Sequence, residues 1–265
     1  MNEQQQRGLE ILTRNLEVFS AHCLKIMDKG GQKVPFIWNK AQRFVHEKLE
    51  EQLAEYGRVR ALVLKGRQQG ISTYTAARFY HKATTNFGKR AFIVSHEAKS
   101  TNNLFGMVKT YHNNNPIPIS TGATNAQELV FDKLEGGYRL ATAGTKDVAR
   151  GNTAQLLHAS EYGFWSNAQS HLAGLGNIIG DIDGTEILLE STANGVGNSF
   201  HGLWLGAEAG ENEWLPIFVP WFWQPEYRAK LRDGFRMSSE DELIMRTYGL
   251  DLEQMQWRAN KISTY

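Results

Sequence analysis

Residues 61–74 read Ala61-Leu62-Val63-Leu64-Lys65-Gly66-Arg67-Gln68-Gln69-Gly70-Ile71-Ser72-Thr73-Tyr74. An apolar run of strand length passes through a glycine-containing loop into a segment with helical spacing. In this order of elements, backbone N–H groups of the loop and of the helix N-terminus converge on one point, where they can bind a phosphate. The stretch therefore predicts a nucleotide site, although an ordinary strand-to-helix turn with Gly70 at a positive φ would have the same pattern.

The loop departs in two places from the phosphate-loop pattern G-x-x-x-x-G-K-[ST]. Gly70 and Ser72 are in register with the pattern, but Lys65 replaces the first glycine and Ile71 replaces the lysine. A phosphate-binding loop still needs positive charge near the β and γ phosphates. We expect Lys65, as a flexible point charge, or Arg67, as a planar fork of donors, to supply it.

Length and composition limit the class of protein. The 265 residues suffice for one large α/β domain, or for such a domain with a small appendage. The 29 basic and 28 acidic residues exclude a globally basic nucleic-acid binder, so DNA contacts would come from local patches or from several subunits together. The single cysteine, Cys23, excludes an intrachain disulfide. Without a signal region or a membrane-spanning apolar run, we expect a soluble cytoplasmic protein with no membrane partner.

The first 56 residues predict two helices. Residues 4–29 carry apolar side chains three or four apart, as one amphipathic helix would, namely Leu9, Leu12, Leu16, Phe19, Cys23 and Met27. Core packing or docking to another chain could explain this stripe. Asn39 and Gln42 have the spacing of a helix N-cap pair, and a helix to about Tyr56 should follow. Gln42 could instead contact an adenine, because an amide both donates and accepts.

Short apolar runs then alternate with helical segments, which is typical of a parallel sheet. Strands are expected at 90–95, 155–161, 185–190 and 215–219, and helices at 72–86 and 97–112. A β-hairpin, inserted in the sheet or added at its edge, is expected around Gly136-Gly137. The fold class is therefore α/β, with a mainly parallel central sheet flanked by helices. We divide the chain into an N-terminal helical segment (1–33), a core (34–220) and a small helical lid subdomain (221–265).

Two strand ends carry polar residues that suit chemistry on a nucleotide. Glu161 ends the strand 155–161, so it could orient and deprotonate an attacking water, unless it is an ordinary surface glutamate. Ser160 stands where an aspartate is usual, and would hold Mg²⁺ weakly or through water. After the strand 185–190, Asn194 could sense the γ phosphate or simply cap a turn. His158 is interpreted as a core residue without a chemical role.

Four segments together resemble one known family. The loop 65–73, Arg150-Gly151-Asn152-Thr153, Leu157-His158-Ala159-Ser160-Glu161 and Ser191-Thr192-Ala193-Asn194-Gly195 are similar to motifs of the large terminase subunit of tailed bacteriophages and prophages. These proteins are motors that drive genome DNA into a preformed capsid. The resemblance runs from about Phe36 to about Trp223. It implies the N-terminal ATPase domain of a large terminase, with the P-loop NTPase fold of the ASCE, RecA-like type.

The resemblance also implies roles for individual residues. Catalytic roles would belong to Glu161, to Arg67 of the loop and to Arg150, which would reach into a neighbouring subunit's site. Mg²⁺ would be bound by Ser72 or Thr73, with Ser160 and Glu161. The ATP contacts would be Gln42, Lys65, Gly66, Arg67, Gln68, Gln69, Gly70, Ile71, Ser72 and Thr73. The motif that couples hydrolysis to movement would be Ser191, Thr192, Ala193, Asn194 and Gly195.

The implied activity is ATP hydrolysis coupled to translocation of double-stranded DNA into a procapsid. The implied partners are double-stranded DNA, further copies of the chain in a ring of five, the portal protein and the small terminase subunit. The site of action would be the host cytoplasm, not the mature virion. The family's nuclease domain would begin about where the chain ends, so we expect no DNA cleavage. A helicase-like ATPase and a nucleotide-binding assembly module without hydrolysis are the alternatives.

Overall fold

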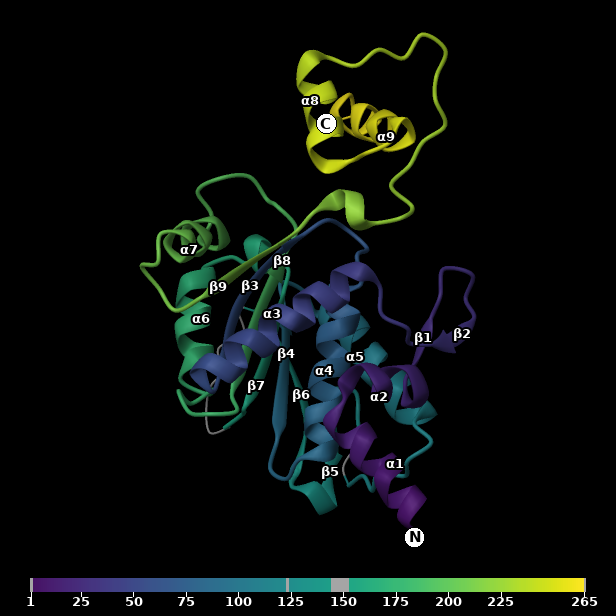
Figure 1. Cartoon of the computed structure of the whole chain (residues 1–265). Coiled ribbons are helices and arrows are strands. Elements are labelled where there is room, and N and C mark those ends of the chain that lie inside the picture. Colours follow the sequence, from purple (N-terminus) through teal and green to yellow (C-terminus); the bar gives the residue numbers. More distant parts are fainter. Residues whose placement is uncertain (1, 123, 144–152, 265) are drawn as a thin grey trace.

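The structure is a computed structural model that describes residues 2–122, 124–143 and 153–264. Within these residues the central sheet has seven strands in the order β5-β6-β4-β7-β8-β3-β9 (Figure 1). In chain order they are β3 (Val59–Lys65), β4 (Arg90–Ser95), β5 (Glu128–Phe131), β6 (Gly136–Thr142), β7 (Leu156–Ser160), β8 (Glu186–Ser191) and β9 (Leu215–Val219). All neighbours pair in parallel except β5 and β6. The predicted α/β class and the hairpin, which lies at the sheet edge, are confirmed.

Helices cover both faces of the sheet (Figure 1). One face packs against α2 (Leu16–Cys23), α3 (Lys40–Tyr56), α4 (Ile71–Thr85) and α5 (Ala98–Asn114). The other face packs against α6 (Ala168–Gly176) and α7 (Ser199–Glu208), which the sequence analysis did not predict. The chain ends in α8 (Ser239–Tyr248) and α9 (Leu252–Ile262), at the opposite end of the molecule from the N-terminus. Short 3-10 turns follow β5, β7 and β9, namely η1 (Asp132–Leu134), η2 (Tyr162–Phe164) and η3 (Trp221–Trp223).

The alternation of side chains along β3 divides the core into two layers. Ala61 and Val63 belong to the layer with α3 and α4, whereas Leu62 packs into the layer with α6 and α7. Successive strand residues point to opposite faces, so a strand covered on both sides is apolar throughout. Each fully buried aliphatic side chain stabilises the fold by roughly 1.5–3 kcal/mol.

One continuous helix over residues 4–29 is wrong. The chain forms α1 (Glu3–Arg14) and α2, separated by Asn15 in an extended conformation. The Asn15 side chain accepts a hydrogen bond from Val18 N, and this competing bond ends one helix and starts the next. Met27 lies in β1 (Lys25–Met27), which pairs antiparallel with β2 (Lys33–Pro35).

The apolar stripe of this N-terminal segment contributes to the core mainly through its second half, since Leu12 of α1 is only partly buried against the core. No residue of α1 is buried, whereas α2 buries Leu16, Phe19 and Cys23. Burial raises the pKa of the Cys23 thiol, as expected of an inert core cysteine. Among the described helices, none is long and apolar enough to cross a membrane.

Candidate nucleotide site

Three neighbouring strands bring the predicted motifs to one edge of the sheet. β8 lies between β3, which leads into the loop 66–70, and β7, which ends just before Glu161. Since all three strands run parallel, their carboxyl ends meet. The residues after β8, from Thr192 onward, therefore lie between the loop and Glu161.

Lys65 is the centre of this edge. Its ammonium Nζ lies 3.2 Å from Oε1 of Glu161 and 3.8 Å from Oε2 of Glu190, and its side chain is 7% exposed. Burial alone would lower the pKa of Lys65, but Glu190 and Glu161 outweigh burial and raise that pKa. The lysine is therefore a buried, protonated cation between two carboxylates.

Glu161 is held from two sides. It adopts a left-handed backbone with φ of 53°, which is uncommon for a residue other than glycine and costs of the order of 1 kcal/mol. Its Oε2 accepts hydrogen bonds from Thr192 N and Thr192 Oγ1, both at 3.3 Å, while Oε1 faces Lys65. The side chain remains 27% exposed, so a water molecule can reach it. A carboxylate fixed in this way suits the predicted role of general base.

The loop ends at the N-terminus of α4. Gly70, the N-cap residue, has φ of 76°, and the helix has no side-chain cap. By contrast, an asparagine side chain caps α3 and α7. The first-turn N–H groups of α4 therefore lack a side-chain acceptor, which leaves them able to bind an anion. A Cβ at position 70 would come within 2.5 Å of Gln42 Nε2, so any other residue would displace the Gln42 side chain as well as strain the left-handed backbone.

Gln42 supports the loop from α3. Its Nε2 donates to Gly70 O at 2.8 Å, and its Oε1 accepts from Asn39 N at 2.8 Å. The Gln42 backbone N–H in turn donates to Asn39 Oδ1, so the predicted capping box is confirmed. Both ends of the Gln42 amide already have protein partners, so an adenine would have to replace one of them. The adenine contact of Gln42 stays a prediction.

The other loop residues connect the loop to the rest of the chain. Gln69 is buried: its Oε1 accepts from Gly66 N at 2.6 Å and its Nε2 donates to Pro220 O at 2.7 Å. Arg67 is exposed, and its carbonyl accepts a hydrogen bond from the Tyr227 hydroxyl. Lys29 bridges the exposed Gln68, at 3.1 Å, and Glu226. The segment after β9 and the β1–β2 hairpin are thus both tied to the loop.

Several predicted residues face elsewhere. The Thr73 hydroxyl contacts Met107 Sδ at 3.9 Å, so Ser72 is the better placed of the two hydroxyls. Ile71 is buried in the core. Asn194 donates to Gly163 O at 2.9 Å, which is the turn-stabilising alternative. Arg150, with Gly151 and Asn152, lies outside the described residues.

The sequence analysis missed Glu190. This residue is fully buried on β8, where Oε1 lies 2.9 Å from His158 Nε2. Burial alone would raise the pKa of Glu190, but Lys65, His158 and the Ser72 hydroxyl lower it to about 2. A glutamate within an apolar strand was the available signal, because a buried carboxylate needs a charged partner. His158 is buried as expected, but it contacts the site through Glu190.

The fold matches solved structures, although no family model matches the sequence. The large terminase of bacteriophage HK97 is similar with a TM-score of 0.65 and 12% sequence identity, over 96% of this chain and 52% of that chain. The large terminase of a thermophilic bacteriophage is similar with a TM-score of 0.56 and 12% identity, over 80% of this chain and 51% of that chain. Its complex with ADP gives a TM-score of 0.53, again at 12% identity, over 80% and 50% of the two chains.

This chain thus spans about half the length of the large terminases that it matches. The loop and strand-end motifs of the sequence predict the same family. The chain therefore has the fold of phage large terminases.

Proposed function

We propose that this chain is the ATPase domain of a phage DNA-packaging motor, which couples ATP hydrolysis to translocation of double-stranded DNA into a procapsid. The observation that carries the proposal is the meeting of the loop and Glu161, whose Oε1 lies 3.2 Å from Lys65 Nζ. In a nucleotide-hydrolysing site, the phosphate cradle and the carboxylate that activates water must adjoin. The fold shared with phage large terminases, one of them in complex with ADP, supports it.

The phosphates would lie at the N-terminus of α4, where the first-turn N–H groups have no side-chain cap. Lys65 and Arg67 would supply the positive charge that Ile71 cannot. Lys65 is buried beside Glu161 and acts as a point charge, whereas Arg67 is exposed and can approach from the solvent side. This division of roles replaces the single lysine of an ordinary phosphate loop.

Mg²⁺ fits the donor atoms at this edge, because they are oxygens of hydroxyl and carboxyl groups. Ser72 would hold the ion on the protein side, with Ser160 and Glu161 contributing through water. A bound Mg²⁺ would supply positive charge against the phosphates. The chain's own part is to position Glu161, through Thr192, for accepting the proton of the attacking water.

Movement would follow from contacts between the site and the segments around it. Residues 191–195 join Glu161 to the η2 turn, because Asn194 contacts Gly163 and Thr192 contacts Glu161. The Tyr227 hydroxyl joins the segment before α8 to the loop. A change at the phosphates would thereby reach the lid and the neighbouring subunit. Gln42 would sense the adenine by exchanging one of its present partners.

The proposal extends to partners. Double-stranded DNA would pass through a ring of five subunits docked on the portal protein, and the small terminase subunit would deliver it in the host cytoplasm. Arg150 would complete the site of the adjacent subunit, and an arginine supplied in this way raises turnover by about 10³ to 10⁵ in known systems. The isolated chain would accordingly hydrolyse ATP slowly.

The Glu161→Gln variant tests the function. We expect ATP binding to be kept and turnover to fall by about 10² to 10⁴, because the general base is lost. ATP affinity by calorimetry and phosphate release under single-turnover conditions measure the two effects. Glu135→Gln is the matched control: Glu135 has a similar left-handed backbone, with φ of 49°, but is exposed at the edge hairpin.

Two outcomes would favour the alternatives. A wild-type chain that binds ATP and shows no turnover at any protein concentration, with or without DNA, would be a nucleotide-binding assembly module. Turnover stimulated by single-stranded DNA and not by double-stranded DNA would indicate a helicase-like ATPase.

A further inference from the structure

The carboxylate that position 160 lacks is present on the neighbouring strand. In P-loop NTPases an aspartate at the end of the strand that carries Ser160 helps to hold Mg²⁺. The parallel register of β7 and β8 places Ser160 directly beside Glu190. Both side chains point to the face covered by α4, because His158, two residues before Ser160, contacts Glu190 there.

Glu190 has one oxygen in a hydrogen bond and one that is held only by the longer ion pair with Lys65. Its Oε1 is 2.9 Å from His158 Nε2, while Oε2 has no hydrogen-bond partner among the described residues, although the side chain is 1% exposed. The nearest cation to Oε2 is Lys65 Nζ at 3.8 Å, which is beyond hydrogen-bond distance. A buried carboxylate oxygen left in this condition is costly, unless a ligand completes it.

We propose that Glu190 supplies the protein carboxylate of the Mg²⁺ site, in place of an aspartate at position 160. This inference rests on the proposed function and adds a residue to it. Ser72 lies in the first turn of α4, with its hydroxyl close enough to hydrogen-bond Glu190, so the two side chains would hold the ion together, directly or through water. His158 then positions Glu190 by holding its other oxygen.

The surroundings suit magnesium. The described residues hold no group of three or more His, Cys, Asp or Glu side chains arranged for a metal. Mg²⁺ needs no such cage, because phosphates and waters provide most of its ligands and one or two protein oxygens suffice. Lys65 neutralises only one of the two carboxylates Glu161 and Glu190, so the group keeps a net negative charge that attracts a cation. The competing interpretation is that Glu190 only neutralises Lys65.

The experiment measures Mn²⁺ affinity, by the loss of the free-ion signal in electron paramagnetic resonance, for the chain saturated with ADP. We expect Glu190→Gln to weaken Mn²⁺ binding by about tenfold or more, since loss of even a supporting residue of a metal site costs about 10-fold to 100-fold. Adding Ser160→Asp to that variant should restore affinity, because the new carboxylate lies beside position 190. A counter-ion for Lys65 alone would not be replaced in this way.

Glu186→Gln is the matched control. It removes another buried carboxylate from the same face of β8, but at the other end of the strand, and should leave Mn²⁺ affinity unchanged. Equal Mn²⁺ affinity for the wild-type chain and Glu190→Gln would overturn the proposal. If Glu190→Gln does not fold, Ser160→Asp alone decides: tighter Mn²⁺ binding supports a metal beside position 190, and unchanged binding contradicts it.

Binding of ADP to the wild-type chain in EDTA distinguishes a failure of the proposed function from a failure of the Glu190 proposal alone. If ADP does not bind with or without metal, the proposed function fails and this inference fails with it. If ADP binds while Mn²⁺ affinity does not depend on position 190, this inference alone is wrong.

Discussion

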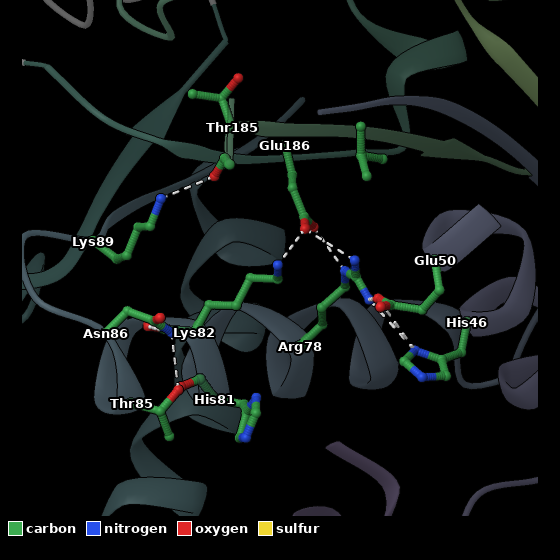
Figure 2. Close-up of polar contacts among 12 residues, drawn as sticks. His46, Glu50, Arg78, His81, Lys82, Thr85, Asn86, Lys89, Thr185 and Glu186 are labelled. Atoms are coloured by element: carbon green, nitrogen blue, oxygen red, sulfur yellow. Dashed lines mark hydrogen bonds and ion pairs between the residues drawn. The ribbon is translucent and has the colours of Figure 1, made fainter. Parts of the chain in front are cut away.

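Glu186 and Glu190 lie four residues apart on the same face of β8, both fully buried, yet their surroundings differ. At the amino end of the strand, Glu186 accepts hydrogen bonds from Arg78 Nε at 2.7 Å and Nη2 at 2.9 Å, and forms an ion pair with Lys82 at 2.7 Å. Figure 2 shows both cations directed at this carboxylate from α4. At the carboxyl end, Glu190 keeps an oxygen without a hydrogen-bond partner, 3.8 Å from Lys65 Nζ.

In the cluster around Glu186, all charged groups are paired. Arg78 is fully buried, and beyond Glu186 its guanidinium contacts Glu50 and the Tyr74 hydroxyl, with His46 alongside (Figure 2). Burial alone would raise the pKa of Glu186, but Arg78 and Lys82 lower it to about 2. Every charge here has an opposite charge beside it, so the cluster joins α3, α4 and β8.

The difference separates a structural ion cluster from a ligand site. A buried charge that is completely paired holds elements in register, and the protein needs nothing else there. A buried carboxylate oxygen without a hydrogen bond, next to a loop with unused N–H groups, is expected to be completed by a ligand instead. The two ends of β8 thus predict different responses to mutation.

The largest expected effect is that of Arg78→Met. This change leaves Glu186 with Lys82 alone in a buried site, and losing one partner of a buried pair costs about 3–5 kcal/mol. Urea denaturation measures the free energy of unfolding. Arg246→Met is the control, because Arg246 is 78% exposed in its pair with Glu242, and such pairs contribute about 1 kcal/mol or less. Equal effects of the two changes would show that the buried cluster is not structural.

Acid should weaken the same cluster. The pKa of Glu186 lies at about 2 in the folded chain and near 4.5 ordinarily. A carboxyl group with a lowered pKa contributes stability above its unfolded pKa and loses it as pH falls toward the folded value. Between pH 5 and pH 3 we expect a loss of about 2 kcal/mol from this group. The pH profile of the free energy of unfolding should be flatter in Glu186→Gln by that amount, and identical profiles would contradict the assignment.

Glu190→Gln sharpens the comparison directly. Without metal or nucleotide at pH 7 it should cost about 1–2 kcal/mol, because Lys65 retains Glu161 and Oε2 has no hydrogen bond to lose. Glu186→Gln should cost more, since it leaves Arg78 buried without its main partner. Chemical denaturation of both variants provides the measurement. A larger cost at position 190 would mean that the two ends are structurally alike.

The smallest effect is expected at the contact between the loop and the segment before α8. Tyr227→Phe removes the hydroxyl that donates to Arg67 O, which is partly exposed to solvent, and should cost about 0.5–1 kcal/mol. Tyr248→Phe, at an exposed ring that packs on Phe222, is the control and should change stability by less. Denaturation curves in urea compare them. Equal free energies of unfolding for Tyr227→Phe and Tyr248→Phe would indicate that the hydrogen bond from Tyr227 to Arg67 O does not stabilise the loop.

Much of the fold could be predicted from local patterns. The strands after residue 58, the helix that begins after Asn39 and the edge hairpin follow from apolar runs, a cap pair and two glycines. The helix expected over 4–29 failed because periodicity does not register a capping asparagine within the stripe. Helices α6 and α7 were missed, since each is short and buries few of its residues.

By itself, the sequence determined the α/β class and the place of the strand, loop and helix around Gly70, because periodicity and glycine positions are local properties of the chain. It also placed Glu161 just after a strand, at the edge of the sheet where ligands bind in α/β folds. Only the tertiary structure decided that Lys65 lies between Glu161 and Glu190, and that Ser160 is beside Glu190. The reason is physical: the order and register of parallel strands depend on crossovers through helices, which no local pattern specifies.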